Sequence, residues 1–298
     1  MTLRTSIRGL RARRLLRLGW SQETSSEHPR RIHSTAMLTA AEDKAKAKTD
    51  TYKLLIVGGG SAGTAVASKF AQKLDKHFIG IIEPSQTHYY QPMFTLVGSG
   101  QRHISQTHRP TGSVLPDNCD WLQTSVSGFS PADNTVSTAD GRLINYEYLV
   151  LALGMETNYQ LVKGLPEALE HDPAVCSNYH PKYAQKTFPA MQAFKEGNAI
   201  FTYPNTLIKC GGAAQKILYM TEEYFRKTGK RDKATMIYNT SLGVVFPVPK
   251  YSKALYAQIL QRNIQLNLMR NLVEVRHETK EAVFEVLGSD GVLETYWP

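Results

Sequence analysis

The stretch between Lys53 and Glu83 constrains the fold more than any other part of the sequence. An apolar run, 54–57, leads into Gly58-Gly59-Gly60-Ser61-Ala62-Gly63, which matches the pattern G-x-G-x-x-G. A helical pattern then continues to about Lys76, and a second apolar run, 78–82, ends at Glu83. This order of strand, glycine turn, helix, strand and acid predicts the first unit of a doubly wound α/β domain that binds a dinucleotide.

Each small residue of the turn has its own expected role. Gly58 would let the chain turn sharply off the strand, and Gly63 would let the helix pack close to that strand. Gly60, which has no side chain, would let a pyrophosphate approach the backbone, and Ser61 and Ala62 open a helix whose free N–H groups favour phosphate. The alternative is a doubly wound domain whose crevice holds no nucleotide.

Two further features narrow the choice of dinucleotide, and together they favour FAD. Glu83 lies where a carboxylate can accept a hydrogen bond from a ribose 2′-OH, which favours FAD or NAD over NADP. Later, a Tyr146-Glu147 pair leads into an apolar strand that we expect to be buried and to stop at Gly154. This pattern is similar to the second fingerprint of flavoproteins with two dinucleotide-binding domains, in which Gly154 would let the chain pass close to the cofactor.

The net charge of +9 is concentrated at the start of the chain. Residues 1–40 hold eight arginines and only two acidic residues, with serines and leucines interleaved. This composition predicts a mitochondrial transit peptide followed by a linker over residues 1–50, and the alternative is a basic tail that binds anionic surfaces. Because the rest of the chain is nearly balanced in charge, nucleic acid is not an expected partner. No apolar run reaches the roughly eighteen residues of a membrane-spanning helix.

The second half repeats the order strand, loop, helix, strand without a glycine turn. An apolar run over 199–203 is followed by a loop with bulky Leu207 and Ile208, so we expect no nicotinamide nucleotide there. Cys210 follows Lys209 and stands where the helix is expected to begin, and both features favour a reactive thiolate. The alternative is a buried structural cysteine.

The two other cysteines, Cys119 and Cys176, lie in polar stretches that we interpret as loops, and we assign them no role. The three cysteines show no metal-ligand spacing, so no metal site and no disulfide framework are expected.

From about Tyr52 to Phe284 the chain resembles the mitochondrial type of sulfide:quinone oxidoreductase. The motifs that carry the resemblance are the glycine turn, Glu83-Pro84-Ser85, Tyr90-Gln91-Pro92, Thr95-Leu96-Val97-Gly98, Arg109-Pro110-Thr111, Gly164-Leu165-Pro166-Glu167, the run 194–202 and Lys209-Cys210. The resemblance implies two Rossmann-like domains of the FAD-dependent pyridine-nucleotide-disulfide-reductase-like type. Residues 52–165 would form the FAD-binding domain, and residues 166–298 a second domain that is NAD-domain-like and carries the redox cysteine.

The resemblance also implies roles for individual residues. Ser61 and Ala62 would contact the pyrophosphate and Glu83 the adenosine ribose, while Gln91 and Val126 would line the bound FAD. Cys210 matches the first of two redox cysteines that lie beside the flavin. The second one belongs to a C-terminal part that we expect this chain to lack.

The implied function is oxidation of hydrogen sulfide to a persulfide, with electrons passing to ubiquinone and the sulfur to a small thiol or sulfite. The implied location is the mitochondrion, in peripheral contact with the inner membrane. Two alternatives stay open: another quinone-linked flavoprotein such as an NADH:quinone dehydrogenase, and a catalytically incomplete FAD-binding protein.

Overall fold

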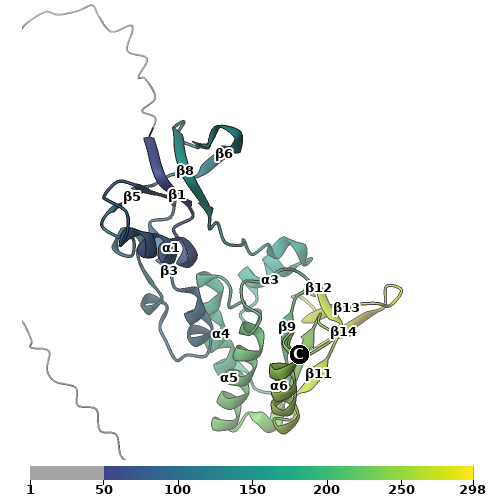
Figure 1. The fold of residues 1–298 in the computed structure, drawn as a ribbon. Helices are drawn as coiled ribbons and strands as arrows, with labels where there is room; N and C mark the ends of the chain where they lie inside the picture. The colour runs from purple at the N-terminus through teal and green to yellow at the C-terminus, as the bar shows by residue number, and fades with distance from the viewer. Residues whose placement is uncertain (1–49, 298) are drawn as a thin grey trace, which may run out of the picture. The chain divides into compact units, whose positions relative to one another are not determined.

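The computed structural model describes residues 50–297, so the leader and linker expected over residues 1–50 lie almost entirely outside the described part of the chain. Within it, strands and helices alternate to form an α/β fold, as predicted (Figure 1). A parallel-rich sheet is built from residues 50–151, and a second parallel sheet from residues 197–267. The unit of strand, loop and helix therefore occurs twice in the chain, once in each sheet.

The first sheet has six strands in the order β5-β2-β1-β8-β7-β6. Four of them are parallel neighbours, β5 (Cys119–Leu122), β2 (Ile79–Ile82), β1 (Asp50–Val57) and β8 (Leu143–Leu151). The outer two, β7 (Thr135–Thr138) and β6 (Val126–Ser130), add antiparallel to β8. Helix α1 (Ser61–Ala71) connects β1 to β2, and a short ribbon, β3 (Thr87–Tyr89) with β4 (His108–Pro110), follows β2.

Side chains of β1 alternate between two apolar clusters, one on each face of this sheet. Leu55 and Val57 belong to one cluster with Ile82 and Ile144, whereas Leu54 and Ile56 belong to the other, which includes Ala67 of α1. A strand covered on both faces is apolar throughout, which explains the uninterrupted run that the sequence shows here.

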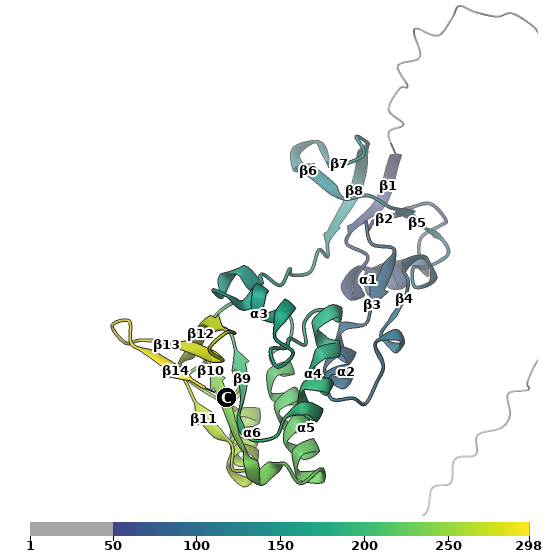
Figure 2. The same ribbon diagram turned by 180° about the vertical axis from the view of Figure 1, so that it is seen from behind.

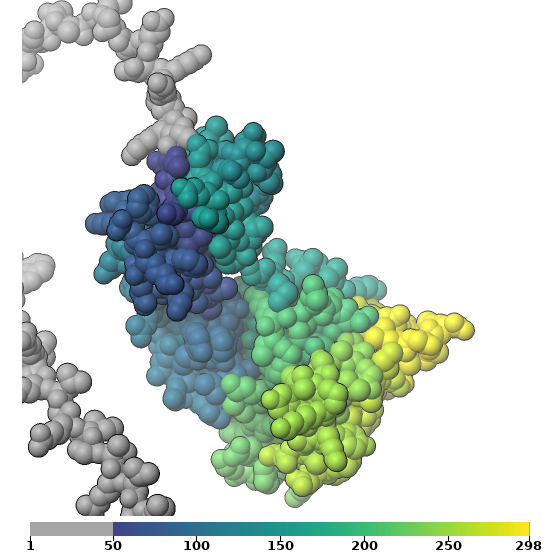
Figure 3. Space-filling view, in the orientation of Figure 1, coloured from purple at the N-terminus to yellow at the C-terminus, as the bar shows by residue number. Residues whose placement is uncertain are grey.

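The second parallel sheet has the order β11-β10-β9, formed by β9 (Gly197–Tyr203), β10 (Ala234–Thr240) and β11 (Gln265–Asn267). Helices α4 (Pro181–Ala193), α5 (Ala213–Lys227) and α6 (Pro249–Gln261) accompany it. An antiparallel sheet of β12 (Arg270–Arg276), β13 (Glu281–Val286) and β14 (Leu293–Tyr296) comes next, and the β13–β14 hairpin, yellow in Figure 3, projects from the surface.

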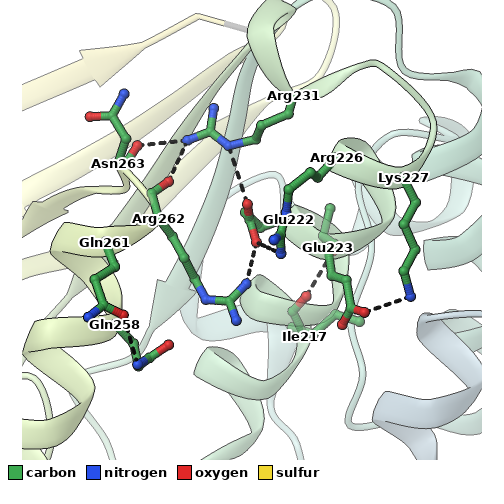
Figure 4. A network of polar contacts seen from close by, with 11 residues as sticks. Ile217, Glu222, Glu223, Arg226, Lys227, Arg231, Gln258, Gln261, Arg262 and Asn263 are labelled. Atoms are coloured by element: carbon green, nitrogen blue, oxygen red, sulfur yellow. Dashed lines mark hydrogen bonds and ion pairs between the residues drawn. The ribbon is translucent and has the colours of Figure 1, made fainter.

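Glu222 of α5 holds this helix to its neighbours. Its side chain is only 4% exposed and pairs with three arginines: Arg226 one turn later, Arg231 before β10, and Arg262 at the end of α6 (Figure 4). Arg231 also donates to the carbonyl oxygens of Arg262 and Asn263, both at 2.8 Å. A carboxylate with this many charged donors can stay buried because its lost hydration is replaced.

Two connections tie residues of the first half to the second. Helix α2 (Phe94–Gly98) packs against α4 and α5 (Figure 2). After β8, the chain runs to α3 (Leu165–His171). Just before that helix, Lys163 makes two backbone hydrogen bonds with β12: its N–H donates to Val273 O at 3.0 Å, and Val275 N–H donates to Lys163 O at 2.8 Å.

Several boundaries differ from the sequence predictions. Helix α1 ends at Ala71 rather than near Lys76, because Asn118 caps it by donating to Ala71 O at 2.8 Å, and His77 then takes a positive φ of 69°. Residues 121–126 span the end of one strand and the start of another, since β5 ends at Leu122 and β6 begins at Val126.

The expectation of a buried strand up to Gly154 is also wrong. Strand β8 begins earlier, at Leu143, and ends at Leu151. Its second half is open to solvent in the described chain, with Tyr148 66% and Leu151 60% exposed. The apolar run thus marks a strand whose second half the described chain covers only in part, with Leu149 and Val150 packed and Tyr148 and Leu151 exposed.

Candidate dinucleotide cleft and redox cysteine

A cleft of about 370 Å³ opens at the carboxyl ends of β1 and β2, beside the start of β6. In doubly wound folds, ligands bind outside the carboxyl ends of the strands at this kind of position. The residues around the cleft come from four separate segments: Val57, Gly58, Ile82, Glu83, Pro84, Ser125, Val126, Ser127, Gly128, Phe129 and Leu153. Three of the predicted site residues, Gly58, Glu83 and Val126, therefore lie together.

The glycine turn has the geometry that its sequence demands. Gly58 has a φ of 104°, in the left-handed region, and a Cβ placed on it would lie 2.3 Å from Ala152 O. A Cβ on Gly63 would lie 1.8 Å from Gly58 O, so helix α1 can approach the turn only with glycine at this position. Both positions exclude any side chain.

The start of α1 is open to a ligand. Gly60 is the N-cap, its backbone is extended, no side chain caps the helix, and a Cβ placed there would meet nothing within 4 Å. Ser61 and Ala62 follow and are both exposed. The first N–H groups of a helix carry partial positive charge and lack intrahelical partners, so this end can take a diphosphate.

Glu83 is fixed beside the turn by two backbone donors. Gly59 N–H donates to one carboxylate oxygen and Ser85 N–H to the other, both at 2.8 Å. A Cβ on Gly59 would lie 2.8 Å from the Cβ of Glu83, so this glycine is needed for the acid to approach. The carboxylate keeps lone pairs for a further donor such as a ribose hydroxyl.

Sequence reasoning missed three side chains that hold the turn. Thr64 Oγ1 donates to Gly59 O at 2.9 Å, and His88 Nδ1 lies 3.2 Å from the same oxygen. Trp121 Nε1 donates to Glu83 O at 2.8 Å. The threonine directly after the last glycine of the turn was a usable local signal, but the other two contacts cross between elements far apart in the sequence.

Two predicted cofactor residues lie outside the lining of the cleft. Gln91 begins a short 3₁₀ turn (Gln91–Met93) and its side chain is exposed. Gly154 follows Leu153, which does line the cleft, and has a φ of 74° with nothing within 4 Å of a Cβ placed there. A glycine in this conformation turns the chain away from the end of β8.

Cys210 lies beyond the carboxyl end of β9, in the loop that leads to α5. It is the exposed member of the three cysteines, so the alternative of a buried structural residue is wrong. The helix begins later than predicted, at Ala213 with Gly212 as N-cap, so Cys210 precedes the first turn of α5. Cys210 is not among the residues that line the cleft.

Basic and phenolic groups surround Cys210. Tyr179 and Tyr203 lie near Cys210, Lys209 precedes it in the chain, and His180 lies near Lys209. Partial burial lowers the pKa of Lys209. Burial and the charges of Lys209 and Lys182 lower the pKa of His180, which keeps the imidazole neutral near pH 7.

Cys119 and Cys176 have no such setting. The prediction that Cys119 lies in a loop is wrong, since it is the first residue of β5. Burial, helped by Asp120, raises the pKa of its thiol to about 11. Burial also raises the pKa of the Cys176 thiol to about 11. Both are therefore protonated at neutral pH.

Residues 52–295 match the family model described as pyridine nucleotide-disulphide oxidoreductase. The chain is 44% identical over 276 residues to the mitochondrial sulfide:quinone oxidoreductase of Mus musculus, covering 93% of this chain and 58% of the relative. It is 42% identical to the protein of the same name from Dictyostelium discoideum, covering 88% of this chain and 58% of that relative. The chain thus spans a little under three fifths of both relatives.

The fold also matches a solved structure, the sulfide:quinone oxidoreductase of Aquifex aeolicus. The TM-score is 0.65 with 21% identity, over 82% of this chain and 56% of that one. The glycine turn, the open helix start and the fixed acid agree with the family match, and together they show that the chain belongs to the pyridine nucleotide-disulphide oxidoreductase family, whose members are FAD-binding flavoproteins.

Proposed function

We propose that this protein oxidises hydrogen sulfide to a persulfide, with FAD bound at the cleft and ubiquinone as the final electron acceptor. The observation that carries the proposal is an exposed cysteine, Cys210, in the unit that repeats the FAD fold. Relatives that are 42–44% identical over most of this chain are named for this activity. Residues 52–165 would form the FAD-binding domain and residues 166–298 the domain that carries Cys210.

In this proposal the chain holds FAD through the backbone of the glycine turn. Gly58, Gly60 and Gly63 let the diphosphate reach the start of α1, where the N–H groups of Ser61 and Ala62 donate to it. Glu83 accepts from the adenosine ribose, and Val126 lines the cleft. Gln91 and Gly154 complete the set, although neither lines the cleft formed by the protein alone.

The chemistry requires a two-electron acceptor beside a sulfur atom. Joining the Cys210 sulfur to the sulfur of hydrogen sulfide as a persulfide releases two electrons and two protons. FAD, when bound, supplies the acceptor for such a pair. Cys210 contributes an exposed thiol with the cationic Lys209 next to it, and a positive charge at that place attracts an anionic sulfur such as hydrosulfide.

The remaining parts of the proposal concern the acceptor of the sulfur and the location of the protein in the cell. The sulfur would leave Cys210 on a small thiol or sulfite, and the protein would act in the mitochondrion in peripheral contact with the inner membrane. The names of the relatives support the compartment. Over residues 50–297, no helix has the length and apolar character needed to cross a bilayer.

The test is anaerobic titration of the purified, FAD-loaded protein with sulfide, followed by flavin absorbance. We expect bleaching in the wild type and in Cys176→Ser, and none in Cys210→Ser. A flavin that stays oxidised in all three proteins contradicts the proposal. Bleaching by NADH instead of sulfide would assign the protein to the NADH:quinone dehydrogenases.

A further inference from the structure

The loop that carries Cys210, residues 204–212, is anchored at its start but not at its tip. Ser241 Oγ donates to Pro204 O at 2.8 Å, and Asn205 N–H donates to Asn271 Oδ1 at 3.1 Å. Leu207, at the tip, is 91% exposed. The position of Cys210 therefore depends on contacts made after the tip.

One of these contacts comes from outside the loop. The hydroxyl of Tyr179, in the segment between α3 and α4, donates to Cys210 O at 2.9 Å. The N–H of Ala213 reaches the same oxygen only at 3.4 Å. Burial, followed by the proximity of Cys210, raises the pKa of Tyr179 well above its usual value, so the hydroxyl stays a donor throughout the physiological range.

Tyr179 is itself fixed at the start of α4. The next residue, His180, is the N-cap of this helix and accepts the N–H of Lys182 on Nδ1 at 3.2 Å. Helix α4 packs against α2, which belongs to the first half of the chain. The tyrosine therefore lies directly before the N-cap of a helix that packs against the first half of the chain.

The residue before Tyr179 contacts the first half directly. A Cβ placed on Gly98, the last residue of α2, would lie 2.0 Å from Asn178 Oδ1. A Cβ on Gly100, two residues later, would lie 2.6 Å from the ring of Phe188 in α4. Glycine at these places lets α2 lie against α4, so the path from Gly98 through Asn178 and Tyr179 to Cys210 is continuous.

We propose that Tyr179 is a positioning residue for Cys210, which it holds through the Cys210 carbonyl in a fixed place relative to α2 and the first half of the chain. The inference rests on the proposed function, in which Cys210 is the reacting thiol. A thiol that must meet a ring bound elsewhere needs a fixed backbone, because small misplacement lowers the rate of reaction strongly. Tyr179 supplies that restraint without touching sulfur or substrate.

The test is Tyr179→Phe, which keeps the ring and removes only the hydroxyl. Tyr183→Phe is the matched control, since it removes a nearby hydroxyl, on α4, that donates to Glu170 at 2.6 Å and not to the loop. The first measurement is amide hydrogen exchange over residues 205–213. Loss of one neutral hydrogen bond predicts exchange faster by about fivefold in Tyr179→Phe and unchanged in Tyr183→Phe.

The second measurement is sulfide-driven bleaching of bound flavin, with flavin affinity measured in parallel. We expect Tyr179→Phe to bleach about fivefold more slowly with unchanged flavin affinity, and Tyr183→Phe to match the wild type. Exchange at wild-type rates in Tyr179→Phe overturns the inference, and so does faster exchange with undiminished bleaching. If the wild-type flavin fails to bleach, the proposed function is wrong, and the exchange result by itself decides whether Tyr179 restrains the loop.

Discussion

The two strand-to-helix loops of this chain differ in how they use the same topology. The loop between β1 and α1 is short, built of glycine, and lets its helix start almost in contact with the strand end. The loop between β9 and α5 covers residues 204–212, exposes Leu207 and carries Cys210. The first presents backbone N–H groups to an anion, whereas the second presents a side chain. In the proposed function, one architecture thus supplies a cofactor-binding turn at one sheet and a reactive cysteine at the other.

The difference in packing between the two loops is tested most strongly by adding one methyl group to each. In Gly63→Ala the new Cβ would collide with Gly58 O, and we expect the free energy of unfolding to fall by more than about 3 kcal/mol. In Gly212→Ala, the N-cap of α5, nothing lies within 4 Å, and we expect a change within about 0.5 kcal/mol. Urea unfolding measures both. Equal losses would mean that the two loops are packed alike.

The helices behind the two loops are also held differently. Helix α1 is held by its close packing against the end of β1, which Gly63 permits. Helix α5 is held by ion pairs between the buried Glu222 and arginines at the end of α6 and before β10. Glu222→Gln leaves these cations without their carboxylate, and we expect a loss of about 3 kcal/mol. Glu223→Gln is the control, because its pair with Lys227 is exposed to solvent and its loss should change the free energy of unfolding far less. Thermal or urea unfolding distinguishes them, and similar losses would contradict the assigned role of Glu222.

A third change separates binding from folding in the first loop. Gly60 has an extended backbone and open space around it, so Gly60→Val should fold normally. Its side chain would occupy the approach of the diphosphate, and we expect FAD affinity to fall about 100-fold, equivalent to roughly 2.7 kcal/mol. Fluorescence titration of apoprotein with FAD gives the affinity. Retained affinity in a folded variant would show that the cofactor does not use this turn.

The smallest effect concerns the second loop. At pH 7, Cys210 should react with iodoacetamide at least about tenfold faster than Cys119 or Cys176, because it is exposed and they are not. The pKa values of Cys119 and Cys176 are raised to about 11, so their thiolate fractions, and their labelling rates, should rise tenfold per pH unit up to that value. Peptide mass spectrometry of a labelling time course measures all three rates, and equal rates at pH 7 would remove the distinction.

How far the sequence predicts the structure also differs between the two loops. The first was predicted nearly in full, because glycine geometry, helix start and acid follow local rules that a short stretch of sequence expresses. Its supports, His88 and Trp121, were missed because they arrive from separate elements. In the second loop, the sequence singled out Cys210 as a candidate, but it did not predict the residues that surround it. The start of α5 was placed too early, and Tyr179 had no local signal, since its contact with Cys210 depends on how α4 packs.

The backbone hydrogen bonds between Lys163 and β12 constrain the order in which the chain can fold during synthesis. The first sheet draws all its strands from residues 50–151 and can form while the ribosome is still translating the second half of the chain. The partners of Lys163, Val273 and Val275, emerge more than a hundred residues later. Until then the connection after β8 lacks its backbone hydrogen bonds to β12. In a nascent chain paused before β12, this connection should therefore be cleaved by added protease faster than in the complete chain.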